Sequence, residues 1–230
     1  MKTTTLSIHL AVALIGVATR AGPVESPSGD WAELRAKSTR VDFSAERIDR
    51  AIGACRAAGL SVGETEELFR AVHLARAENL PADRVFLKIE EGLAKGASSE
   101  DVLAAANRRL ECLRETDALV MTVRPRRGEQ HGHLLSHACV AMESGVPKSS
   151  LKAVFERPGF RYGRLIHAVE AGENLTLAGM PDDQVLIIMN DCLDRALTGV
   201  ETHRVVETLV SGLAAGRGFD ELRASLWIGR

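Results

Sequence analysis

The stretch NLPADRVFLKIEEGLAKGAS, residues 79–98, carries the pattern that decides the fold class. Val85, Ile89 and Leu93 are spaced by four residues, which places them on one face of a helix. Gly96 is expected to take the left-handed conformation that ends a helix, with the next apolar residue packed back on the last turn. Proline or serine then begins the following helix. The stretch therefore predicts one helix between two short links.

The same kind of helix stop recurs along the chain. A Gly or Asn, one apolar residue, and a Pro or Ser stand at Gly59-Leu60-Ser61, Asn79-Leu80-Pro81, Gly96-Ala97-Ser98, Gly145-Val146-Pro147 and Gly179-Met180-Pro181. Aromatic residues make up only 4% of the chain, and the alternating pattern of strands is rare. The sequence therefore predicts an all-α fold of successive antiparallel helix pairs with hardly any loop between them.

The stops also recur at regular distances. Positions 59, 79 and 96 are separated by 20 and 17 residues, and so are positions 179, 199 and 216. This offset of 120 aligns Gly92-Leu93-Ala94 with Gly212-Leu213-Ala214, and a rival offset of 100 aligns Leu80-Pro81 with Met180-Pro181. A two-helix unit of about 37 residues is typical of helical-repeat, or solenoid-like, arrays. The alternative is a chance self-alignment of a helical chain rich in Leu, Ala, Gly and Arg.

Residues 1–21 have the layout of a secretory signal peptide. Lys2 supplies a minimal positive start, residues 6–18 are mostly apolar, and small residues offer two cleavage points. A retained membrane anchor is the alternative, but this run is short of the roughly 20 apolar residues that span a bilayer. We therefore expect an exported protein, periplasmic or extracellular, with no transmembrane segment in the mature chain.

Proline, glycine and charge divide the rest of the chain. Residues 22–42 are expected to form a flexible leader with a short helix, residues 43–123 a first helical-repeat half, and residues 165–230 a second. Residues 124–164 carry eight Lys or Arg against three acids and contain two proline breaks, which predicts a basic, irregular helical connector. Both halves are acidic, with 14 basic against 18 acidic residues over 22–123 and 5 against 10 over 165–230.

The connector offers a candidate surface for an anion or a partner. Its candidate contact residues are Arg124, Arg126, Arg127, Arg157, Arg161, Tyr162 and Arg164. Basic groups beside an aromatic side chain can hold an anionic polymer, a phosphate-bearing headgroup or a nucleic acid. Export disfavours nucleic acid, so the expected partner is another protein or an envelope polymer. In the alternative interpretation the basic connector simply lies against its acidic neighbours.

The connector also contains a histidine cluster. His131, His133 and His137 fall within seven positions, and the last two share one helix face. Imidazoles placed in this way are candidate ligands for a transition metal. No carboxylate close in sequence completes the set, since the nearest are Glu129 and Glu143. An exposed polar helix start is the competing interpretation.

The cysteines and the known catalytic signatures give little further guidance. Each cysteine falls at or near an apolar position of an expected helix: Cys55, Cys112, Cys139 and Cys192. An exported chain could pair them as two disulfides in three ways, and four buried free thiols are the alternative. The chain contains no Cys-x-x-Cys, phosphate loop, dinucleotide fingerprint, nucleophile elbow or zinc-protease signature.

These observations favour an exported, non-enzymatic helical-repeat protein that binds another macromolecule or acts as an envelope scaffold, with no cofactor. The alternative is a metal- or small-ligand-binding protein, with or without enzymatic activity, that uses His131, His133 and His137.

Overall fold

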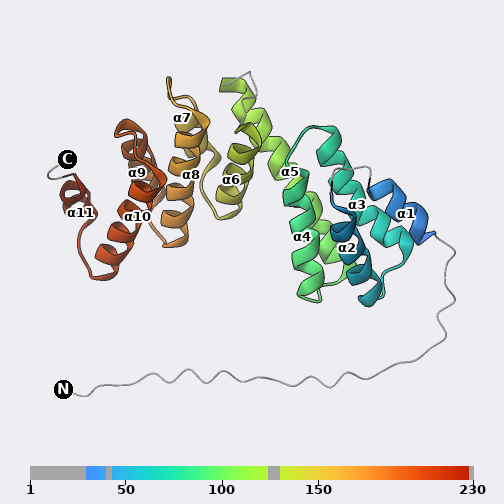
Figure 1. Ribbon diagram of the computed structural model, residues 1–230. Helices are drawn as coiled ribbons and strands as arrows, with labels where there is room; N and C mark the ends of the chain where they lie inside the picture. Colours follow the sequence, from blue (N-terminus) through green and yellow to red (C-terminus); the bar gives the residue numbers. More distant parts are fainter. Residues whose placement is uncertain (1–29, 40–42, 124–129, 228–230) are drawn as a thin grey trace, which may run out of the picture.

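The computed structural model describes residues 30–39, 43–123 and 130–227 (Figure 1). Within these ranges the chain forms eleven α-helices and no strand, which confirms the all-α prediction. The helices are α1 Trp31–Ser38, α2 Ala45–Ala57, α3 Val62–Ala77, α4 Ala82–Ala94, α5 Ser99–Val123, α6 His131–Glu143, α7 Lys148–Phe155, α8 Tyr162–Leu177, α9 Asp182–Asp194, α10 Gly199–Ala214 and α11 Phe219–Leu226. The predicted signal peptide, residues 1–21, lies outside the described residues.

The helices pack in successive adjacent pairs. Most of them also contact the helix two places along the chain, as α3 does with α5, α6 with α8, and α8 with α10. Odd-numbered and even-numbered helices therefore make up two layers, which follow a curved path from α1 to α11 (Figure 1). None of the helices in the described ranges combines the length and the apolarity that crossing a membrane requires.

Left-handed residues end the helices where the sequence predicted them. The backbone angle φ is positive at the six predicted stops Gly59, Asn79, Gly96, Gly145, Gly179 and Gly216. The amide of the next residue then donates to a carbonyl in the last turn, as Leu60 does to Cys55 and Met180 to Leu175, both at 3.0 Å. This hydrogen bond closes the helix and lets the chain reverse within a link of four residues.

Position 199 corrects one of the predicted stops. Gly199 is the first residue of α10, and the left-handed residue that ends α9 is Ala196, with a φ of 55°. The amide of Leu197 donates to the carbonyl of Cys192 at 3.0 Å, as at the glycine stops. Alanine seldom takes this conformation, so a search for Gly or Asn could not find it.

The helix starts are regularly spaced in both halves of the chain. α2, α3, α4 and α5 begin at residues 45, 62, 82 and 99, so their starts lie 17, 20 and 17 residues apart. α8, α9, α10 and α11 begin at residues 162, 182, 199 and 219, with steps of 20, 17 and 20. A pair of helices therefore advances the chain by 37 residues in either half.

The long helix α5 joins the two halves. Its 25 residues correspond to a length of about 37 Å, since an α-helix rises 1.5 Å per residue. It packs against α3 and α4 on one side and against α6 and α7 on the other. Ion pairs accompany both contacts. Towards α3, Nε of Arg114 donates to Oε2 of Glu78 at 2.7 Å.

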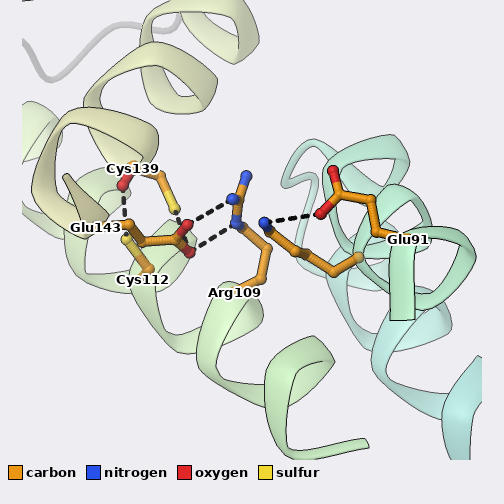
Figure 2. Close-up of polar contacts among 6 residues, drawn as sticks. Glu91, Arg109, Cys112, Cys139 and Glu143 are labelled. Atoms are coloured by element: carbon orange, nitrogen blue, oxygen red, sulfur yellow. Dashed lines mark hydrogen bonds and ion pairs between the residues drawn. The ribbon is translucent and has the colours of Figure 1, made fainter. Parts of the chain in front are cut away.

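A buried arginine holds α5 against α6. Arg109 is only 5% exposed, and its Nε and Nη2 donate to the two carboxylate oxygens of Glu143 at 2.8 and 2.6 Å (Figure 2). A guanidinium this deeply buried would be costly without a partner. The two parallel hydrogen bonds therefore fix where α6 packs along α5.

Two glycines let consecutive helices approach closely. A Cβ on Gly92 of α4 would lie 2.7 Å from Cγ2 of Val102 on α5. A Cβ on Gly212 of α10 would overlap the side chain of Leu222 on α11. Val102 and Leu222 are buried in the core, and the β-branched valine has little freedom to rotate away.

We expect Gly92→Ala to lower the free energy of unfolding. The clash with Val102 costs about 1–3 kcal/mol, more than the roughly 0.5–1 kcal/mol that alanine gains over glycine inside a helix. Gly53→Ala in α2 is the matched control, because a Cβ there meets nothing within 4 Å. Urea denaturation should show a lower midpoint for Gly92→Ala and a raised one for Gly53→Ala. Equal shifts in the two variants would contradict the close α4–α5 contact.

We expect Arg109→Ala to destabilise the protein by about 2–3 kcal/mol. The substitution leaves the carboxylate of Glu143 without its partner. Because the Glu143 side chain is 35% exposed, the loss of stability is smaller than for a fully buried ion pair. The neighbouring Arg108→Ala removes the same charge from an exposed position and should change stability by less than about 0.5 kcal/mol. Guanidinium chloride denaturation of both variants measures the difference. Similar values for both would show that the buried pair does not hold α5 to α6.

Candidate functional site

Three of the predicted contact residues line one open groove. Arg161, Tyr162 and Arg164 stand at the start of α8 and border a groove of about 1030 Å³. Residues 196–198 of the link between α9 and α10 also line it, together with Gly199 at the start of α10. None of the described lining residues is a carboxylate, and neither guanidinium makes a hydrogen bond or ion pair with another described residue. The groove therefore carries unneutralised positive charge.

The N-terminus of α8 adds to this charge. Arg161 occupies the N-cap and gives the first turn no side-chain acceptor, because a guanidinium has none. The start of α10 differs, since Thr198 and Glu201 form a capping box there. The first backbone N–H groups of α8 therefore lack a side-chain cap, and the positive end of this helix dipole lies at the groove.

Arg157 has a structural role instead. Its Nη1 donates to Oδ1 of Asn190 at 3.1 Å, its Nη2 pairs with Asp194, and its guanidinium lies 5.8 Å from the ring centre of Phe160. These contacts tie the segment between α7 and α8 to α9. The intramolecular alternative thus describes this arginine. The three remaining candidates lie outside the described residues: Arg124, Arg126 and Arg127.

His131 is buried at the start of α6, with 4% of its surface exposed. Its Nε2 lies 2.7 Å from Oδ1 of Asp117 on α5, and its ring meets Tyr162 edge-on with the ring centres 5.8 Å apart. Its Nδ1 has no hydrogen-bond partner among the described residues. His131 therefore links α6 to α5 and supports the tyrosine that lines the groove.

His137 faces the neighbouring helix instead. Its Nδ1 lies 3.3 Å from Oε1 of Glu170 on α8, and Oε2 of the same carboxylate lies 3.2 Å from Nδ1 of His167. Burial lowers the pKa of His137, so the ring is neutral at neutral pH. His133 lines a separate groove beside Pro81. The side chains of the three histidines that are close in sequence therefore lie in three separate environments. Glu170 contacts both His137 and His167, which lies outside the sequence cluster.

A different set of metal-ligating side chains comes together between α5 and α6. The Sγ atoms of Cys112 and Cys139 and a carboxylate oxygen of Glu143 lie within 4.8 Å of one another (Figure 2). The Sγ of Cys112 donates to the carbonyl oxygen of Cys139 at 3.4 Å, and the Sγ of Cys139 lies 3.9 Å from Oε1 of Glu143. Both oxygens of this carboxylate already bind Arg109.

The two thiols differ in acidity. The contact with Cys139 lowers the pKa of Cys112, and the charge of Arg109 lowers it further, against the opposing effect of burial. The pKa of Cys139 is raised, first by its contact with Cys112 and then by burial. Cys112 is therefore the thiol that ionises first. Burial raises the pKa of Cys55, and raises that of Cys192 to about 12.

Sequence reasoning missed this cysteine pair because its members stand 27 positions apart, on two helices. The one local signal is the four-residue spacing of Cys139 and Glu143, which puts a thiol and a carboxylate on the same helix face. The partner on α5 follows only from the register between α5 and α6. Sequence alone does not give that register.

Comparison with known proteins adds no assignment. No protein-family model matches this chain, and neither a curated protein nor a solved structure gives a match. The function must therefore be argued from the residues and their geometry.

Proposed function

We propose that this chain is an exported, non-enzymatic helical-repeat protein that binds another macromolecule, either a protein or an envelope polymer. The groove lined by Arg161, Tyr162 and Arg164 receives a carboxylate- or phosphate-bearing segment of that partner. Export follows from the signal-peptide pattern of residues 1–21.

The regular helix spacing supports the repeat. A step of 37 residues carries the start of α2 to that of α4 and the start of α3 to that of α5. The same step carries the start of α8 to that of α10 and the start of α9 to that of α11. Equal link lengths and left-handed stops accompany this step, so the agreement does not rest on composition alone. Arrays of stacked helix pairs commonly present an extended surface to a binding partner.

The uncompensated charge of the groove carries the binding proposal. Most arginines in the described residues pair with a carboxylate or stack on an aromatic ring, as Arg109 does with Glu143 and Arg195 with Trp227. Arg161 and Arg164 do neither, although they stand beside an uncapped helix start and a tyrosine. Two exposed guanidinium groups, with no carboxylate among the described residues of the groove, favour an anionic group of a partner.

We expect the double variant Arg161→Glu/Arg164→Glu to bind an acidic probe at least about tenfold more weakly than the wild type, because two attractive charges become repulsive. The probe is a fluorescein-labelled oligoglutamate peptide, and its fluorescence anisotropy measures the affinity. Wild-type affinity should fall as salt rises.

Arg108→Glu is the matched control for this experiment. It reverses the charge of an exposed arginine on α5 that lines none of the grooves described above, and it should bind the peptide as the wild type does. Equal losses in Arg108→Glu and the double variant would show a general charge effect and would remove the groove from the proposal.

A second candidate function is metal binding at His137, Glu170 and His167. The observation that favours it is the single carboxylate of Glu170, which lies 3.3 and 3.2 Å from the two imidazoles. Asn174 and His203 line the same groove, which has a volume of about 440 Å³. Two imidazoles and a carboxylate are a ligand set that Zn²⁺ accepts. This set shares His137 with the predicted trio, and the Glu170 carboxylate contacts both of its imidazoles.

We expect isothermal titration calorimetry with Zn²⁺ to detect binding that His137→Ala/His167→Ala weakens at least about tenfold. The measurement uses a Cys112→Ser/Cys139→Ser background, which removes the competing thiols. His133→Ala is the control, because its side chain lies in another groove. Affinity should fall as the pH is lowered, because a protonated imidazole cannot bind a metal ion. An equal loss in the His133→Ala variant would contradict this assignment.

A further inference from the structure

We propose that Cys112 and Cys139 form a dithiol centre that undergoes thiol–disulfide exchange with a disulfide-bearing molecule and closes to a disulfide bond between α5 and α6. This centre is separate from the groove, and it stands whether or not the groove binds a partner. Three observations carry the proposal: the placement of the two thiols, their unequal exposure, and the charged pair beside them.

The placement brings the two sulfur atoms together across a helix contact. They lie within 4.8 Å of each other, and the Sγ of Cys112 is 3.4 Å from the main-chain oxygen of Cys139 itself (Figure 2). A disulfide requires an S–S distance near 2.05 Å and Cβ atoms about 3.8 Å apart. Rotation about χ1 of either cysteine moves its Sγ relative to that of the other, so sulfur atoms that start this close can approach further.

The unequal exposure gives the two cysteines different parts in the exchange. Cys112 is half-buried, so an external disulfide can reach it, whereas Cys139 is fully buried. Cys112 is also the more acidic thiol, because Cys139 and Arg109 both lower its pKa. An accessible thiolate beside a buried second thiol is the arrangement of an attacking and a resolving cysteine.

The reaction balances with the external disulfide as oxidant. The Cys112 thiolate attacks one sulfur of RSSR, which forms a Cys112–SR mixed disulfide and releases RS⁻. The Cys139 thiol then loses its proton and attacks the Sγ of Cys112, which releases the second RS⁻. Both thiol protons end on the two RSH molecules, and RSSR accepts two electrons.

The charged pair argues against a metal ion in the same place. Cys112, Cys139 and Glu143 are chemically acceptable ligands for Zn²⁺. However, both oxygens of Glu143 accept hydrogen bonds from Arg109, which is buried and pairs with no other carboxylate of the described residues. A divalent cation at the thiols would lie against this guanidinium and compete with it for the carboxylate. The fixed positive charge instead favours a thiolate without a metal.

Oxidised glutathione tests the proposal on the reduced full-length chain. The wild type should lose two hydrogen atoms in its intact mass, and peptide mapping should show one crosslink between Cys112 and Cys139. Cys139→Ser should instead accumulate one glutathionyl group on Cys112, because no resolving thiol remains. Cys55→Ser/Cys192→Ser should oxidise as the wild type does, since its substitutions leave the pair intact.

A melting experiment gives a second readout. The crosslink closes a 27-residue segment between two packed helices, so it should raise the melting temperature by roughly 5–10 °C. Addition of a reductant should reverse the shift, and Cys112→Ser should not show it. Circular dichroism of each serine variant establishes that it is folded before oxidation.

Three results would overturn the proposal. The first is a folded wild type that keeps both thiols free in oxidised glutathione, and the second is a crosslink that involves Cys55 or Cys192. The third is stoichiometric Zn²⁺ that protects Cys112 and Cys139 and is lost in Cys112→Ser, which would assign the cluster to a metal.

Discussion

The four-residue link between helices is the constraint on which the rest of this structure depends. Seven of the ten links between these helices have four residues, within which the chain must close the last turn, reverse and begin the next helix. A left-handed residue makes this possible, because it lets the following amide bond back into the helix. Links this short keep each helix close to its neighbours, so every helix after α1 packs against the one before it, the one two places back, or both. The layers, the close contacts at Gly92 and Gly212, and the groove between helix starts all follow from that geometry.

Much of the fold could be predicted from sequence because these stops are local. The helix stops at Gly59, Asn79 and Gly96 can each be recognised from three consecutive residues. The spacing of the apolar residues between the stops predicts which face of each helix is buried. Ala196 shows the limit of this reasoning, since tertiary packing holds an alanine in a conformation that its residue type disfavours. The sequence predicts that α5 begins near Ser99 and ends before the proline at position 125. It does not predict that this helix joins the two halves of the chain.

The candidate sites also differ in whether their residues are close in sequence or come from separate helices. Arg161, Tyr162 and Arg164 are neighbours in sequence, so the structure keeps them together at one helix start. Sites that cross between helices behave differently. His137 finds its partner on α8, and Cys112 meets Cys139 across 27 positions, because the packing register decides which side chains face each other. That register is set by summed side-chain packing and by the Arg109–Glu143 pair, and no motif in one segment encodes it.

The pattern of helix contacts also has a consequence for how the chain folds. Substantial contacts within the described ranges join helices no more than two places apart, so most stabilising contacts are short-range in sequence. Such a contact order is typical of rapid folding, with little loop entropy lost before contacts form. During synthesis the segment up to α5 can pack before α6 has emerged from the ribosome. The exposed half of α5 then serves as the template on which the second half assembles.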